Sequence, residues 1–153
     1  MTEYVLDNIK LSLQTYLETT LTALQVEAGS SIVTPTPQEY KIGVHDPDVL
    51  TTYPSIVIWS PYSRKKTDQA GFQEREIWFR VLSWITENDL ENLHRFVSRY
   101  SDGVGTVLRN ESYWNVNLHN PVIEDSNNTD LYETNVGYAQ GTLLEGTIDY
   151  ILS

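Results

Sequence analysis

The chain has 153 residues, a length at which one hydrophobic core suffices for a single domain. Its 21 acidic and 10 basic residues give a formal net charge of -11, and this negative field argues against tight non-specific binding to DNA or to anionic membranes. Cysteine is absent, which excludes disulfides, thiolate nucleophiles and cysteine-based metal centres and suits a reducing cytoplasm.

The first predicted element is an amphipathic helix over residues 2–28. Apolar residues recur in it every three or four positions, so they lie along one stripe. Gly29 and the two serines after it indicate its end. The stretch 32–52 contains three prolines, which fix φ and remove backbone donors, so we expect a structured loop with one short strand at 40–44. The predicted stripe consists of Leu6, Ile9, Leu13, Leu17, Leu21 and Leu24.

Two runs rich in strand-forming residues follow, YPSIVIW at 53–59 and FQEREIWFRVLSWI at 72–85. The polar segment between them ends in glycine, which predicts a hairpin with a long tip. Side chains of a strand alternate between its two faces, and both faces of the second run carry large side chains, so both need cover. One face has Ile77, Phe79, Val81 and Ile85, and the other has Trp78, Arg80, Leu82 and Trp84.

A second helix is predicted to begin at the sequence NDLE, residues 88–91, which has the form of a capping box. Its apolar residues keep a three-four spacing over five turns, and the glycines at 103 and 105 are its weak points. The stripe consists of Leu90, Leu93, Val97, Tyr100, Val104 and Val107.

Beyond this helix the chain predicts two more strands. Residues 114–118 alternate between apolar and polar until Pro121 disturbs pairing, and residues 138–152 form the last strand. The acidic stretch 124–133 has no periodicity and is interpreted as a loop. This order favours one α+β domain over residues 1–153, with a mostly antiparallel sheet of four to five strands and two main helices packed on one face.

No segment predicts transport to a membrane. The N-terminal residues lack a basic region followed by an apolar run, and no apolar stretch reaches the ~20 residues of a spanning helix. We therefore expect a protein that is neither secreted nor inserted in a membrane.

The sequence gives little support for an active site. His45 stands in an HDPD segment typical of a turn, and His94 adjoins the stripe of the second helix, where we expect a partly buried, hydrogen-bonded imidazole. Neither a nucleophile elbow nor a phosphate-binding glycine motif is present. Glu74 and Glu76 share a strand face, as catalytic carboxylates would, but charges also protect exposed strand edges. We therefore predict no catalytic, cofactor-binding or metal-binding residues.

Two features suit contacts with other proteins. Arg64, Lys65 and Lys66 form a basic cluster at the predicted hairpin tip, which is either a solvated loop or a contact with an acidic neighbouring subunit. The chain also contains ten Tyr and four Trp. These residues are enriched at protein interfaces, and a Trp-rich core is the alternative interpretation.

The chain contains, in order, a long N-terminal helix (YVLDNIKLSLQTYLETTLTAL), a strand introduced by proline (YPSIVIW), a polar hairpin into a wide strand (FQEREIWFRVLSW), a capped helix (ENDLENLHRFVSRYSDGVGTVL) and a closing strand (GTLLEGTIDYIL). This order and texture resemble the tail terminator, or tail completion, proteins of long-tailed bacteriophages. Neck and head-tail joining proteins share some of the plan.

The resemblance implies a ring of six copies that caps the growing tail tube and later presents a surface to the head-proximal connector. It implies no reaction and no cofactor, DNA that passes through without specific binding, and a place in the virion after assembly in the host cytoplasm. An exposed second face of the wide strand would supply the contact between subunits. The residues predicted at protein contacts are Arg64, Lys65, Lys66, Trp78, Arg80, Leu82 and Trp84.

Two alternatives stay open from the sequence. A head-to-tail connector or neck component would also form a ring. A small hydrolase built around His45 or the pair of Glu74 and Glu76 would instead be a monomer with a deep pocket.

Overall fold

The computed structural model describes residues 2–43, 50, 52–69, 72–135 and 137–152, with only the backbone at 64–69, 72–73 and 152. Along the chain, each of two long helices is followed by strands of one sheet. The elements are α1 (Thr2–Glu27), β1 (Glu39–Ile42), β2 (Ser55–Trp59), β3 (Ser63–Gln69), β4 (Phe72–Glu87), α2 (Leu90–Arg109), the short 3-10 helix η2 (Glu111–Tyr113), β5 (Leu118–Asn128), β6 (Tyr132–Thr134) and β7 (Gly137–Leu152).

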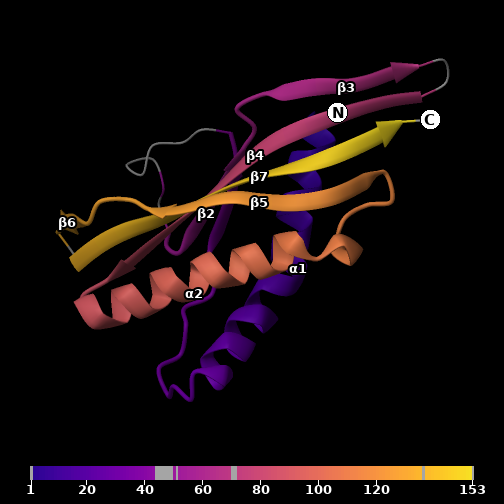
Figure 1. The fold of residues 1–153 in the computed structure, drawn as a ribbon. Coiled ribbons are helices and arrows are strands. Elements are labelled where there is room, and N and C mark those ends of the chain that lie inside the picture. Colours follow the sequence, from indigo (N-terminus) through magenta and orange to yellow (C-terminus); the bar gives the residue numbers. More distant parts are fainter. Residues whose placement is uncertain (1, 44–49, 51, 70–71, 136, 153) are drawn as a thin grey trace.

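The strands form one mostly antiparallel sheet (Figure 1). Its main path is β1-β2-β4-β7-β5. In addition, β3 pairs with β4 and β6 pairs with β7, so the described part of the chain has seven strands. Only β1 and β2 run parallel. Both helices lie on the same face of the sheet (Figure 1). The predicted α+β class, with two main helices on one face, is confirmed.

The central pair of strands is longer than the helices that cover it. β4 and β7 have 16 residues each and pair from Gln73 opposite Leu152 to Glu87 opposite Tyr138. At ~3.4 Å per strand residue and ~1.5 Å per helix residue, the ladder spans roughly 50 Å, whereas the 26 residues of α1 span about 39 Å and the 20 of α2 about 30 Å. The β3–β4 end of the sheet therefore projects beyond α2 (Figure 1).

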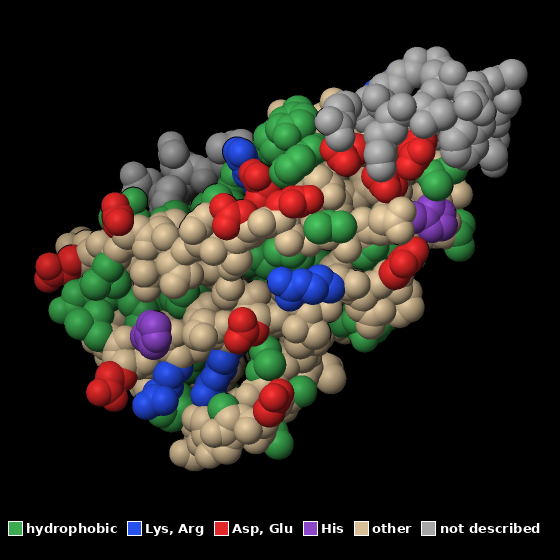
Figure 2. Space-filling model, in the orientation of Figure 1, with side chains coloured by type: hydrophobic (Ala, Val, Ile, Leu, Met, Phe, Trp, Pro, Cys, Tyr) green, Lys and Arg blue, Asp and Glu red, His purple; other side chains and the backbone are tan. Residues whose placement is uncertain are grey.

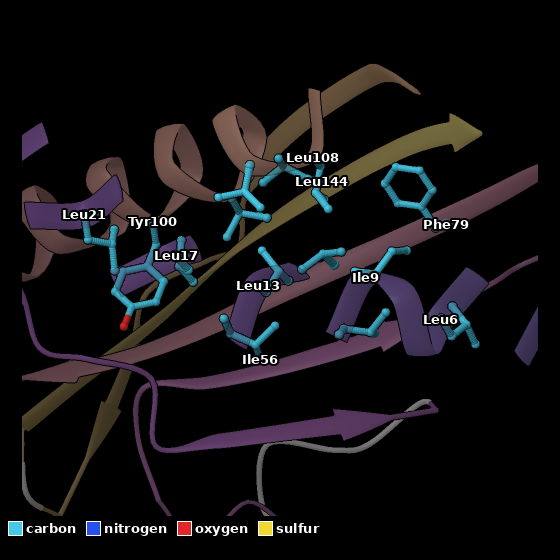
Figure 3. Close-up of a cluster of buried hydrophobic side chains, with 14 of the residues drawn as sticks. Leu6, Ile9, Leu13, Leu17, Leu21, Ile56, Phe79, Tyr100, Leu108 and Leu144 are labelled. Carbon is cyan, nitrogen blue, oxygen red and sulfur yellow. The ribbon is translucent and has the colours of Figure 1, made fainter. Parts of the chain in front are cut away.

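The core fills the space between the helices and one face of β4 and β7 (Figure 3). The face of β4 that carries Ile77, Phe79, Val81 and Ile85 is fully buried there, as its alternation predicts. Gly103 lets α1 approach α2 closely, because its α-carbon faces Leu21 and Leu17. The helix α2 is continuous through this glycine. Of the predicted α1 stripe, the buried members are Leu6, Ile9, Leu13, Leu17 and Leu21.

Two side chains of α2 fasten the proline-containing stretch to the helix layer. The Tyr100 hydroxyl donates a hydrogen bond of 2.6 Å to the Pro35 carbonyl. Arg99 Nη1 donates to the Ile32 carbonyl at 2.7 Å and to Thr34 Oγ1 at 2.9 Å. These bonds satisfy carbonyls of a segment that has few partners of its own, and they lead the chain into β1 beside β2.

The fifth strand differs from its prediction. Residues 114–117 are not a strand: Trp114 is buried, with Nε1 donating to the Leu108 carbonyl at 2.8 Å, and Val116 is 86% exposed. β5 instead begins at Leu118 and runs into the stretch interpreted as a loop. Two register shifts against β7 interrupt its alternation, so the period of two is lost while backbone pairing continues. The predicted hairpin tip likewise contains β3, paired with β4.

We predict that Gly146→Ala is more destabilising than Gly103→Ala. A methyl group at 146 would lie 2.5 Å from the Val122 carbonyl oxygen, which is fixed backbone, and 2.6 Å from Phe79 Cζ. At 103 it would meet the end of the Leu21 side chain at 3.0 Å and gain helix propensity. Urea denaturation should show a loss of about 1–3 kcal/mol or more for Gly146→Ala and a change within about 1 kcal/mol for Gly103→Ala. Equal losses would contradict the packing described.

Alkaline pH should destabilise the fold through its buried phenols. Burial, and then the nearby Glu18 carboxylate, raises the pKa of Tyr40 to about 12 from the ordinary 10.0, and burial also raises the pKa of Tyr100. Because the pKa values are higher in the folded state, the contribution of these phenols to stability is fully present below pH 10. It is lost as the pH rises toward 12. Urea unfolding across this range should show a shallower decline for Tyr40→Phe, and an unchanged decline would refute the assignment.

Candidate protein-interaction face

The face of the sheet turned away from the helices is the candidate site, and we call it the far face. It is built from the β4 residues Trp78, Arg80, Leu82 and Trp84 and from the residues across from them in β2 and β7. Directly opposite residues in a ladder share a face, so Leu82 lies beside Val57 and Leu143 there. No helix covers this side in the described structure (Figure 1).

Trp84 is not exposed, so the prediction that it lies on an open surface is wrong. It is 5% exposed and packs in a second hydrophobic cluster with Leu50 and Val57. Tyr132 lies against its ring, with centroids 5.8 Å apart. Gly141 makes room for the indole, because a methyl group there would lie 3.2 Å from Trp84 Cε3. Segments before β2 and in β6 thus cover this end of the far face, which the sequence pattern of β4 alone could not show.

Trp78 remains partly open at the other end of the far face. Its ring stacks on Tyr62, with centroids 5.3 Å apart and planes at 30°, and Tyr62 is itself 52% exposed. Trp78 Nε1 donates to Glu76 Oε1 at 3.0 Å. The ring is therefore held in one orientation and presents an edge of aromatic surface, a combination typical of protein contacts.

Between the two tryptophans lie one ion pair and one aliphatic pair. Arg80 Nε and Glu145 Oε2 are 2.5 Å apart, with side chains 38% and 25% exposed. Leu82 and Leu143, the next pair along the ladder, are half-buried. At this exposure the ion pair adds roughly 1 kcal/mol or less to stability, so it fixes side-chain positions more than it holds the fold.

The basic cluster lies on a strand and not on a loop tip. The backbone of Arg64 pairs with that of Glu76, and Lys65 with Arg75. A register shift separates Lys65 from Thr67. The side chains of Arg64, Lys65 and Lys66 lie outside the described residues.

The residues considered for catalysis do not form a site in the described structure. His94 is exposed on α2 and not partly buried, and His119 Nδ1 lies 3.5 Å from Glu111 Oε1. His45 lies outside the described residues. Glu76 accepts the Trp78 bond, as noted above. Among the residues that the structure describes, no three His, Asp or Glu side chains are grouped to hold a metal ion.

Sequence reasoning missed the far-face residues contributed by other strands. Leu143 and Glu145 join the site through pairing with β4, and Tyr62, just before β3, joins it by stacking on Trp78. Alternation along β7 puts Leu143 and Glu145 on the face opposite the buried Leu144. Only the register between β4 and β7 shows that they lie beside Leu82 and Arg80.

The comparisons with known proteins give no family. No protein-family model matches the chain, and no curated protein matches it. In the described part of the chain, no helix has the length and apolar character needed to cross a membrane.

The two tryptophans of the far face should respond differently to truncation. Trp84→Ala removes a buried ring and should lower the free energy of unfolding by about 3–5 kcal/mol. Trp78→Ala removes a partly exposed ring and should cost clearly less, because water already reaches part of it. Urea denaturation of the two variants tests this, and a greater loss for Trp78→Ala would show that the burial is assigned to the wrong residue.

Proposed function

We propose that the protein is a structural subunit of a long-tailed phage, a tail terminator whose copies close into a ring on the end of the tail tube. One observation carries the proposal. The far face keeps partly open aromatic and aliphatic side chains, from Trp78 and Tyr62 at one end to Leu82 in the middle, although both long helices of the described structure cover the other face. A surface of this kind suits a protein partner.

The arrangement of the molecule supports a ring more than a two-fold pair. Each copy carries one far face, because the two long helices close the other side of the sheet, and this face would meet a different surface of the next copy that does not include the outer side of α2. A contact between unlike surfaces leaves each copy with one free surface of each kind, so repeated contacts close into a ring when the rotation per copy allows it.

The charge of the chain supports passage of DNA through such a ring. A net charge of -11 keeps the surface from binding phosphate backbones tightly. The basic residues Arg64, Lys65 and Lys66 would then contact the tail tube or the next copy and not the genome. The remaining partner is the head-proximal connector, and no step of this function needs a cofactor.

Leu82→Glu tests the proposal at the middle of the far face. A charge there should block association, because a buried unpaired carboxylate is strongly unfavourable. The matched control is Thr106→Glu, on the exposed side of α2. Light scattering and negative-stain imaging with purified tail tubes should show ring formation and capped tubes for the wild type and for Thr106→Glu, and neither for Leu82→Glu.

Two results would count against the proposal. Leu82→Glu that is folded and still caps tubes would exclude the far face as the contact. A wild-type ring that leaves tube growth unchanged would instead favour a neck or connector role.

A further inference from the structure

A groove on the helix side of the molecule has a chemistry that the far face does not share. It has a volume of about 480 Å³ and lies between the C-terminal end of α1 and the outer side of α2. Its polar lining consists of His94, Arg95, Ser98 and Arg99 with Glu27, Ser30 and Asp102. Figure 2 shows basic side chains gathered beside a histidine over α2.

Arg99 is a largely buried arginine whose guanidinium forms no ion pair within the described residues. It is only 8% exposed, and its hydrogen bonds to the 32–34 segment use Nη1 alone. The Phe96 ring lies 5.9 Å from its Cζ. In the part of the chain that the structure describes, no carboxylate forms an ion pair with Arg99, and Nε and Nη2 have no acceptor. These two nitrogens are not fully enclosed, so they reach the groove, where an anion can accept their hydrogen bonds.

The groove supplies further donors around this guanidinium. Arg95 and Ser98 precede Arg99 on the same helix and line the same groove. Arg95 makes only a long contact of 3.9 Å with Glu91, which is 86% exposed, so it is free to turn toward a ligand. A guanidinium presents its N–H groups as a planar fork that matches the two oxygens of a carboxylate.

We propose that this groove binds a single carboxylate carried by a protein partner. Glu27 and Asp102, on the lining, balance the two arginines and so disfavour a polyanion such as a phosphate chain or nucleic acid. The groove is open on one side, so it cannot enclose a small molecule on its own, and the rest of the contact must come from the protein that carries the carboxylate.

The site lies on the helix side of the sheet and is independent of the proposed ring contact. It would give the helix layer its own partner, recognised by an exposed Asp, Glu or C-terminal carboxylate. Failure of the test below would therefore leave the far-face proposal unchanged, and failure of ring formation would leave this site unchanged.

The experiment follows the Arg Nε–Hε and backbone amide signals of the 15N-labelled protein by NMR during titration. The probe is N-acetyl-aspartate N-methylamide, the matched control is the asparagine analogue, and inorganic phosphate is a third arm. We expect saturable shifts of Arg99 and of α2 amides near residues 94–98 with the aspartate probe, with a Kd on the order of millimolar for one isolated pair. The asparagine analogue should give none.

Three variants locate the site. Arg99→Lys keeps the positive charge but loses the planar guanidinium. Arg95→Gln removes an exposed donor and leaves the hydrogen bonds to residues 32–34 intact. Arg95→Gln therefore stays folded even if Arg99→Lys does not. Arg99→Lys should weaken binding tenfold or more, and Arg95→Gln severalfold. Arg109→Gln, at the end of the same helix, should bind the probe as the wild type does. Equal shifts with the asparagine analogue, no saturable shift, a response to phosphate alone, or wild-type binding by Arg95→Gln would each overturn the proposal.

Discussion

The antiparallel ladder between β4 and β7 is the constraint on which the rest of the structure depends. A strand presents its side chains alternately, so a ladder this long produces two wide faces at once. α1 and α2 close the first face with a continuous apolar core. Among the described residues, the second face is closed at the Trp84 end alone, by the segment before β2 and by Tyr132. This unequal cover makes the Trp78 end the candidate for contact with another protein.

Much of the fold could be predicted from periodicity alone. The stripe of α1 and the buried face of β4 match their patterns, since both lie against one continuous core over many residues. The NDLE segment correctly indicated where α2 begins, but the cap is Asp89 and not Asn88, and the Asp89 side chain accepts hydrogen bonds from the backbone N–H groups of Glu91 and Asn92. β5 could not be predicted from its sequence, because register shifts break its alternation. Its polar residues form a strand because they pair with β7.

The candidate sites were less predictable than the fold. Alternation placed Trp78 and Trp84 on one face, but the difference between them comes from Leu50 and Tyr132, whose positions depend on the whole chain. The environment of Arg99 could not be predicted from the sequence either. Its sequence position predicts a helix and a charge, whereas its burial arises from the packing of α1 and the 32–34 segment around it. Such features follow from tertiary contacts that no local pattern encodes.

The central claim is that the Trp78 end of the far face is covered when the protein acts. Hydroxyl-radical footprinting of the free protein and of the protein bound to tail tubes tests this most directly, with buried Trp114 and half-exposed Tyr4 on the helix side as references. We expect Tyr62 and Trp78 to lose most of their reactivity in the assembly while Trp114 stays protected in both states. Unchanged reactivity of Tyr62 and Trp78 on assembled tubes would contradict the claim.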